Sequence, residues 1–441
     1  MRQQTSFLPL PAGFSLTQAV CSYGFFVLSP NKWRPQGEST QPAFERPLQL
    51  DRERRARFEL TQPVGNTLKL SATDGEALTP AGWSHVHLQV KRMLRLHQKD
   101  CEDVAAFQKL SSAAAQQNFG RLFRSPDIWE DLVKSILLCN CGWGRTVAMN
   151  AALVEHVGKG GFPTAAETAA YGAERLQADC GLGYRARTIS KLAQQVVAGE
   201  MQLEAFEAGH SPTTTWQDAE KEVRKAAGMG PFTAANMLQL MGHYAHIPCD
   251  SETMRHLKKH HGLTACAQGQ LQEKAQQAYA AFAPYQFLAY WHELWMDYEA
   301  RFGSFANMKA EDYALITGHN MRQSKEGCEP DSKPCKRRKS QPTDMDDPLT
   351  SPATPALGAS TAAASGCLDA LPPAAGLAAS AAAAAVNEPP QLIRIQLQGL
   401  LVVAKILVSH HWQMVAQEAD NTRPSTGKDV AKSKLRIMSM D

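Results

Sequence analysis

Apolar residues recur at helical spacing through the middle of the chain. Ile128, Leu132 and Ile136 lie four residues apart, which places them on one face of a helix. Three later segments show the same pattern: 152–157, 189–197 and 234–241. An aromatic-rich segment, 282–298, ends the compact part. We therefore predict a helical domain over residues 111–308.

The first hundred residues mix the patterns of strands and helices. Apolar and polar residues alternate at 47–50 and at 68–71, as they do in half-buried strands. Residues 85–96 begin with alternation and end as a basic helix. We predict an α+β fold, in which a small mixed domain of sheet and helix over 14–110 precedes the helical domain.

The composition changes after residue 308. Residues 341–390 are mainly Pro, Ala, Ser and Thr, and such a segment cannot bury enough apolar surface to offset the entropy lost on ordering. We expect 309–441 to be a mostly disordered tail. Its basic cluster at 336–339 is typical of a nuclear localisation signal or of a non-specific DNA-binding arm, so we expect a nuclear protein.

Charge and cysteine content narrow the class of protein only slightly. The net charge is +3, which neither requires nor excludes a nucleic acid partner. The ten Cys include no C-x-x-C pair, so a reducing compartment is expected. The most apolar late stretch, 400–409, is broken by Lys405 and is far shorter than the roughly 20 residues of a membrane span. We expect no membrane partner.

The most informative segment is 222–257. A helical pattern leads to Gly228-Met229-Gly230, and Pro231 then suits the first position of a second helix. The two Gly allow positive φ and close approach of another backbone, while the free N–H groups of the turn and helix start suit a phosphate. Some twenty residues later, Asp250 precedes another helix start. One interpretation of Asp250 is simply an N-cap.

This segment resembles the hairpin of the helix-hairpin-helix (HhH-GPD) DNA glycosylases. Residues 180–187 (CGLGYRAR) resemble a segment of the eukaryotic 8-oxoguanine glycosylases, and 131–145 resembles the helix and loop that carry their strand-inserting Asn. The resemblance covers roughly 14–305 and indicates the branch of the 8-oxoguanine glycosylases and 3-methyladenine glycosylase II. It implies a monomeric enzyme of base excision repair that acts on duplex DNA containing a modified base.

The resemblance also implies the chemistry. Asp250 would oppose the positive charge that grows on the sugar as the N-glycosidic bond breaks. Bifunctional members carry a Schiff-base Lys at the position that is Phe232 here, so we expect hydrolysis without strand cleavage. A bifunctional glycosylase that uses another amine and a non-catalytic lesion-binding protein remain alternatives.

Further site residues are implied by the resemblance. Excision requires the target base to leave the stack, so the gap must be filled and held. Tyr184 would wedge into the stack, Asn140 would plug the gap, and Arg145 and Arg185 would contact the orphan base or its phosphate. The hairpin would bind DNA through Gly228, Met229, Gly230, Phe232 and Thr233. The base pocket would comprise Gly24, Phe232, Tyr290 and Trp291, although core packing is an alternative for the aromatic residues.

No cofactor is expected. Cys139 and Cys141 form a C-x-C pair without neighbouring ligands, which is a weak metal signal. The spacing of Cys328 and Cys335 resembles the start of the iron–sulfur loop of the endonuclease III branch, but the C-x-x-C that follows in that branch is absent, so we expect no cluster. The resemblance is compatible with a monovalent cation in the hairpin, bound by the backbone carbonyls of Arg224, Ala226 and Met229.

Overall fold

The computed structural model describes residues 4–322, except 39, 52–53, 64, 75–76, 204–205, 207–215, 227 and 264–265. All of the described residues belong to one compact unit, 1–334. The predicted tail from residue 323 onward, including the basic cluster at 336–339, lies outside the described residues, so its disorder stays a prediction. No helix among the described residues is long and apolar enough to cross a membrane.

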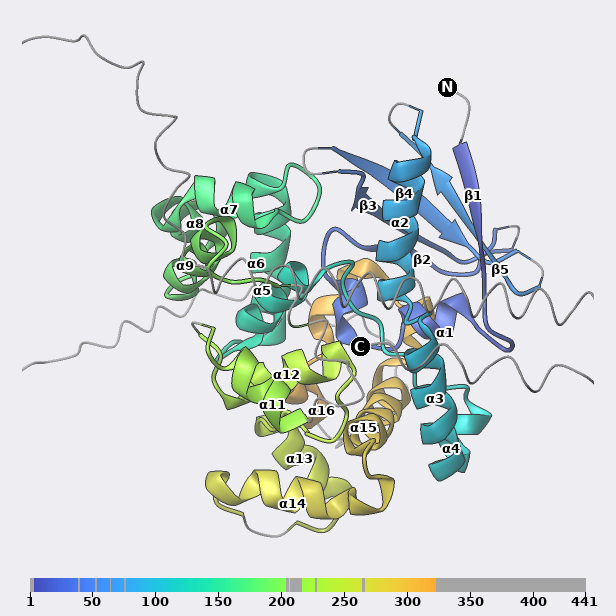
Figure 1. Ribbon diagram of the computed structural model, residues 1–441. Coiled ribbons are helices and arrows are strands. Elements are labelled where there is room, and N and C mark those ends of the chain that lie inside the picture. The colour runs from blue at the N-terminus through green and yellow to red at the C-terminus, as the bar shows by residue number, and fades with distance from the viewer. Residues whose placement is uncertain are drawn as a thin grey trace, which may run out of the picture. The chain divides into compact units, whose positions relative to one another are not determined.

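The N-terminal part is built on a five-stranded antiparallel sheet with strand order β1-β5-β4-β3-β2 (Figure 1). Its strands are β1 (Gln4–Pro9), β2 (Lys32–Arg34), β3 (Ala43–Gln49), β4 (Arg55–Thr61) and β5 (Thr67–Ala72). The two predicted strands fall in β3 and β5. The sheet begins before the start predicted at residue 14, because β1 pairs with β5 from Gln4 opposite Ala72 to Pro9 opposite Thr67. Only Leu8 is buried in β1, so this edge strand has no alternating pattern to reveal it.

The other regular elements of the described chain are helices, which with the sheet give an α+β fold (Figure 1). The helices before residue 160 are α1 (Leu16–Val20), η1 (Gly24–Val27), α2 (Pro80–Met93), α3 (Gln98–Leu110), α4 (Ser112–Gln116), α5 (Ile128–Leu138), α6 (Trp143–Ala152) and η2 (Leu153–Val157). Those between 160 and 262 are α7 (Ala165–Tyr171), α8 (Ala173–Cys180), α9 (Arg185–Val197), α11 (Trp216–Val223), α12 (Pro231–Met241) and α13 (Ser251–His260). The last ones are η3 (Gln268–Gln270), α14 (Leu271–Ala278), η4 (Ala280–Phe282), α15 (Gln286–Phe302), η5 (Phe305–Asn307), η6 (Ala310–Leu315) and α16 (Gly318–Arg322).

Sheet and helices share one hydrophobic core. Phe44 of β3 packs edge-on against Phe123, with ring centroids 5.3 Å apart. The alternating residues of β3, β4 and β5 turn their apolar side chains toward this core. The division of the chain into two domains near residue 110 stays a prediction.

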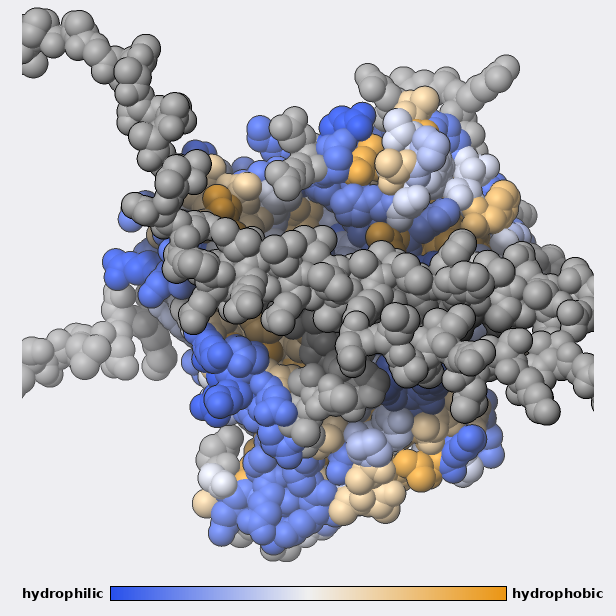
Figure 2. All heavy atoms as spheres, viewed as in Figure 1, coloured by the Kyte–Doolittle hydropathy of each residue, from blue (hydrophilic) through white to orange (hydrophobic). Residues whose placement is uncertain are grey.

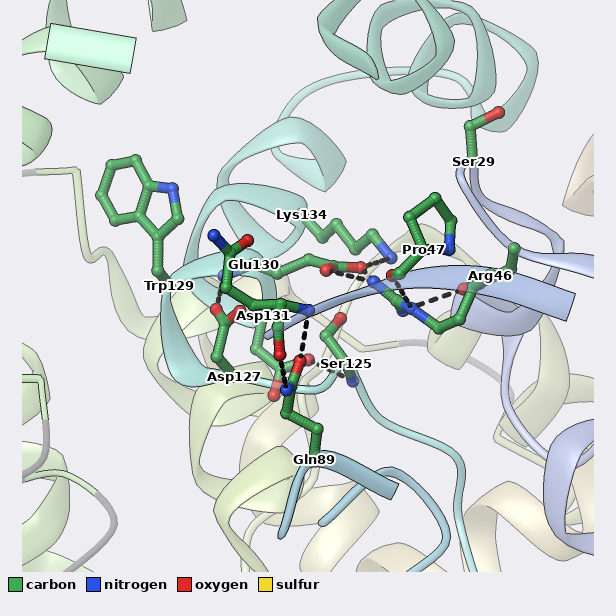
Figure 3. A network of polar contacts seen from close by, with 12 residues as sticks. Ser29, Arg46, Pro47, Gln89, Ser125, Asp127, Trp129, Glu130, Asp131 and Lys134 are labelled. Carbon is green, nitrogen blue, oxygen red and sulfur yellow. Dashed lines mark hydrogen bonds and ion pairs between the residues drawn. The ribbon is translucent and has the colours of Figure 1, made fainter. Parts of the chain in front are cut away.

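A buried network of charges joins the sheet to α5 (Figure 3). Arg46 of β3 makes a two-pronged contact with Glu130, at 2.8 Å (Nη2 to Oε2) and 3.3 Å (Nη1 to Oε1). The Nζ of Lys134 lies 2.6 Å from Oε1 of the same carboxylate. All three side chains are at most 2% exposed, so Glu130 neutralises one of two buried cations. Breaking such a pair from one side is costly, because the remaining charges stay buried.

Residues 309–322 correct the predicted start of the tail, because they fold against the helical part. Tyr313 in η6 is 7% exposed, and its ring packs edge-on against Phe26 with centroids 5.7 Å apart. The indole N–H of Trp143 donates to the carbonyl of Tyr313 at 2.9 Å. The composition of the whole tail obscured this short segment, whose aromatic residue covers apolar surface left by η1 and α6.

Candidate active site

Asp250 is the N-cap of α13, as its position before a helix start predicted. Its Oδ1 accepts hydrogen bonds from the amides of Glu252 and Thr253, both at 2.9 Å. The hydroxyl of Thr253 lies 3.2 Å from the same oxygen, and every hydrogen bond that the described residues donate to this carboxylate ends on Oδ1. The capping role and a role in chemistry are compatible, because a half-buried Asp250 also lines a cavity.

The hairpin between α11 and α12 has the predicted form. Gly228 has a φ of +81°, and a Cβ there would lie 2.5 Å from Cγ2 of Thr188 in α9, so both the turn and the close approach require Gly. Gly230 is the N-cap of α12 and Pro231 is its first residue. Gly230 and Pro231 are exposed, so this helix start is open to a phosphate. Residue 227, inside the hairpin, lies outside the described residues.

The cavity that Asp250 lines has a volume of about 620 Å³. Ten of the 27 described residues that line it are aromatic: Tyr23, Phe25, Phe26, Trp143, Phe232, Phe287, Tyr290, Trp291, Trp295 and Tyr298. Asp250 shares this cavity with all four residues predicted for the base pocket: Gly24, Phe232, Tyr290 and Trp291. Aromatic walls bury apolar surface and stack on planar rings, so a cavity of this kind suits a nucleobase.

Phe232 occupies the first turn of α12, half-buried at the cavity wall. No Lys or Arg is present among the described residues that line the cavity. Lys225, in the segment before the hairpin, is exposed and forms an ion pair with Glu222 at 2.7 Å. The described part of the cavity therefore offers a carboxylate but no side-chain amine that could form a Schiff base.

Two aromatic residues of α15 are fixed by hydrogen bonds at the cavity wall. The hydroxyl of Tyr290 lies 3.0 Å from that of Thr253, the residue that also bonds to Asp250. Burial and the charge of Asp250 raise the pKa of Tyr290 well above its ordinary value, so its phenol stays neutral. The indole N–H of Trp291 donates to the carbonyl of Ser22 at 2.9 Å, and its ring stacks on Phe287.

Three residues predicted to hold the DNA gap come together on an exposed surface beside the cavity. Asn140 lies in the loop between α5 and α6 with a φ of +46°, and its amide nitrogen is 3.4 Å from the hydroxyl of Tyr184. Tyr184 is 61% exposed, which is unusual for an aromatic side chain. The exposed Arg145 points a guanidinium nitrogen to within 3.5 Å of the carbonyl of Gly181, in the turn before Tyr184. Residues on either side of Asn140, including Leu138 and Cys141, line the cavity.

The side chains of three other residues predicted to contact DNA are buried. Arg185 is 3% exposed, and its guanidinium donates to the carbonyls of Cys139 and Asn140. Thr233 is 1% exposed and its hydroxyl lies 2.7 Å from the sulfur of Cys139. Met229 is 5% exposed and anchors the hairpin in the core. These side chains support the hairpin and the loop that carries Asn140 from beneath, and the DNA contacts predicted for the three residues stay predictions.

Sequence reasoning missed part of the cavity wall. Glu252 lines it, and burial raises the pKa of this carboxyl although Arg255 holds it through an ion pair at 2.6 Å. Residues 316–320, from the end of η6 into α16, form another side of the cavity. Gly318 lies against Glu252, because a Cβ there would be 2.0 Å from Oε2. The spacing of Glu252, two residues after Asp250, is the signal that could have indicated it.

The carbonyls predicted to bind a monovalent cation lie at the hairpin. The carbonyl of Ala226 accepts a hydrogen bond from the amide of Met229 at 3.3 Å. A carbonyl oxygen has a second lone pair, so this bond leaves the predicted ligation by Arg224, Ala226 and Met229 open as a prediction.

Comparison with known proteins gives only structural similarities. No protein-family model matches the chain, and no curated protein matches it. It is similar to the 3-methyladenine DNA-glycosylase from Archaeoglobus fulgidus, with 17% identity and a TM-score of 0.49 over 66% of this chain and 98% of that one. It is also similar to MBOgg1 in complex with a low-affinity DNA ligand, with 16% identity and a TM-score of 0.47 over 67% of this chain and 99% of that one. The Clostridium acetobutylicum 8-oxoguanine glycosylase/lyase in its apo-form has 15% identity and a TM-score of 0.44 over 61% of this chain and 93% of that one.

Proposed function

We propose that this protein is a monofunctional DNA glycosylase of base excision repair. The observation that carries the proposal is one cavity, lined by aromatic rings, in which Asp250 and Phe232 are both present. The aromatic walls suit a flipped base, and the carboxylate suits the cationic sugar that forms as the base leaves. Phe232, and the lack of any amine among the described lining residues, favour hydrolysis over a lyase reaction.

The reaction follows from these groups. A modified base enters the aromatic cavity, and the bond between its nitrogen and C1′ of the sugar breaks, so the bonding electron pair leaves with the base. The positive charge that grows on the sugar is opposed by the carboxylate of Asp250, held in place by two backbone amides. Water then adds to C1′ and gives up a proton, which compensates the electron pair on the departed base, so the products are the protonated free base and an abasic site.

The surface beside the cavity supports an encounter with duplex DNA. Asn140, Arg145 and Tyr184 are exposed next to the loop that lines the cavity, where a plug and a wedge are needed once a base has left the stack. The exposed start of α12 is suited to a backbone phosphate. Because phosphate contacts release counterions, affinity should fall as salt rises. Nuclear localisation, based on the cluster at 336–339, is part of the same proposal.

The test is incubation of the full-length protein with duplexes that carry a panel of modified bases, followed by treatment with or without alkali. Strand breaks only after alkali are expected. Asp250→Asn should lower the single-turnover rate at least about a hundredfold while sparing DNA affinity, because it removes one charge and keeps the shape. Asp127→Asn is the matched control, since Asp127 caps α5 in the same way at 2.8 Å but lies outside the cavity lining.

Each outcome separates the alternatives. Breaks without alkali would indicate a bifunctional enzyme. No breaks with any lesion, together with tight binding of one of the duplexes, would indicate a lesion-binding protein. An Asp250→Asn variant that keeps more than about a tenth of the wild-type rate would exclude a catalytic carboxylate at this position.

A further inference from the structure

Two histidines and a carboxylate converge outside the cavity, where α13 meets α15. His256 lies in α13, His261 caps its C-terminal end, and Glu293 lies in α15. One carboxylate oxygen, Oε2 of Glu293, is 3.0 Å from Nε2 of His256 and 2.8 Å from Nε2 of His261. The hydroxyl of Tyr279 contacts the same oxygen and lies 3.0 Å from Nε2 of His261. Four polar atoms from three helical segments therefore meet at one point.

The spacing of these atoms is close to that of a tetrahedral zinc site. Zinc binds imidazole nitrogen and carboxylate oxygen at about 2.0–2.2 Å, which places neighbouring ligand atoms about 3.3 Å apart. The nitrogen of either histidine is within 0.5 Å of that distance from Oε2 of Glu293, as the distances of 3.0 and 2.8 Å show. All three ligand atoms lie within 4.8 Å of one another, so small side-chain movements suffice to admit an ion.

A second set, His256, His260 and Asp297, also has ligand spacing, but its charge argues against it. Asp297 contacts the guanidinium of Arg255 at 3.0 Å and the ammonium of Lys259. A divalent ion at Asp297 would meet two cations that already share that carboxylate. Glu293 has only imidazoles and a phenol as partners among the described residues, so its charge is available to a cation.

We propose that His256, His261 and Glu293 bind a zinc ion, with Tyr279 or a water in the fourth position. Two imidazoles and one carboxylate form the ligand set that transition metals of zinc's softness prefer. His256 is fully buried and gives the site a fixed wall, whereas His261 and Glu293 are 27% and 36% exposed and give it an entry path. Hydrophilic residues gather at the lower left of the molecule in Figure 2, where Figure 1 places α13 and the start of α14.

The site would brace the wall of the base cavity. Tyr290 lines the cavity, and the far side of its ring meets His256 and Tyr279 edge-on, at centroid distances of 5.7 and 5.8 Å. Asp250 caps the N-terminal end of α13. This helix carries His256, and His261 caps its C-terminal end. A metal ion would thus tie that helix to α15 and restrain Tyr290 between them. This role is structural, so it stands apart from the glycosylase proposal.

The test uses the full-length protein after removal of metal with a chelator. Zinc affinity is measured by competition with a chromophoric chelator, and metal content is measured by elemental analysis. His261→Ala and Glu293→Gln should each weaken zinc binding at least about a hundredfold, since even the loss of a partner of a ligand costs about 10–100-fold. His260→Ala is the matched control and should bind zinc as the wild type does, because His260 belongs only to the second set.

The variants also separate this site from the cysteines. All ten Cys remain in each variant, so zinc held by thiolates would be retained in His261→Ala and Glu293→Gln alike. Zinc should raise the melting temperature of the wild type and of His260→Ala but not of the two ligand variants. Equal zinc affinity in all four proteins, no zinc binding by the wild type, or loss of binding in His260→Ala would each overturn the proposal. Glu293→Gln keeps the shape of the side chain, so it gives an answer even if His261→Ala unfolds.

Discussion

Replacing Glu130 by Gln should destabilise the protein strongly, because it leaves Arg46 and Lys134 buried without an anion. Burial acts to raise the pKa of Glu130, but the attraction of Arg46 and Lys134 outweighs it and lowers that pKa from 4.5 to about 2. Such a change corresponds to about 3 kcal/mol of folding free energy. The loss expected on removing one partner of a buried ion pair is about 3–5 kcal/mol, so the two figures agree.

The same network predicts an asymmetry between its members. Lys134→Met removes the surplus cation and leaves the two contacts between Arg46 and Glu130 in place. It forfeits the contacts of the ammonium with Phe25 and Phe162, at 5.5 and 5.6 Å from the ring centroids, but Met fills much of the same volume. We expect a loss below about 2 kcal/mol, smaller than that of Glu130→Gln.

The measurement is urea-induced unfolding of wild type and both variants at pH 7 and at lower pH. The carboxylate of Glu130 has a lowered pKa in the folded state, so its contribution is fully present above pH 4.5 and is lost as the pH falls toward 2. The difference between wild type and Glu130→Gln should therefore shrink in acid. A Glu130→Gln variant within about 1 kcal/mol of the wild type at pH 7, or a larger loss in Lys134→Met, would refute the reasoning.

Two further predictions concern the active site. Borohydride should trap no covalent adduct between protein and lesion-containing DNA, because Phe232 supplies no amine; an adduct that survives denaturation would show that another amine attacks the sugar. Truncation after Met308 should impair excision, because it removes Tyr313 and the cavity wall at 316–320, whereas truncation after Arg322 should leave the single-turnover rate unchanged. Equal rates for the two truncated proteins would show that this wall is dispensable.

Local signals made the hairpin and the cap of α13 predictable. The pair Gly228 and Gly230, Pro231 and Asp250 act through their own backbone conformations and nearest neighbours, which a sequence displays directly. The aromatic residues of 285–298 marked this helix, while the choice of Tyr290 and Trp291 for the base pocket depended on the family resemblance. These are features that a chain specifies over short distances.

Burial of polar residues was not predictable in the same way. Arg185 and Cys139 are 46 residues apart in the chain, so only the packed structure shows that the guanidinium supports the loop that carries Asn140. Thr233 likewise meets Cys139 across 94 residues. The cavity wall at 316–320 was not predicted for a related reason. Its position depends on the hydrogen bond from Trp143 to the carbonyl of Tyr313, and these two residues are 170 positions apart in the chain.

The walls of the cavity come from segments that are far apart in the sequence, so the ribosome synthesises them at different times. Ser22, beside η1, is joined to Trp291 across 269 residues, and Trp33 is joined to Ala306 across 273. During translation Phe26 of η1 cannot contact Tyr313 until η6 has been synthesised, since contacts between distant segments form only after the loop between them is closed. The cavity-lining residues of η1 therefore lack part of their contacts until nearly all of the described part of the chain has left the ribosome. Cavity residues, more than those of the hairpin, are where we expect a chaperone to bind during synthesis.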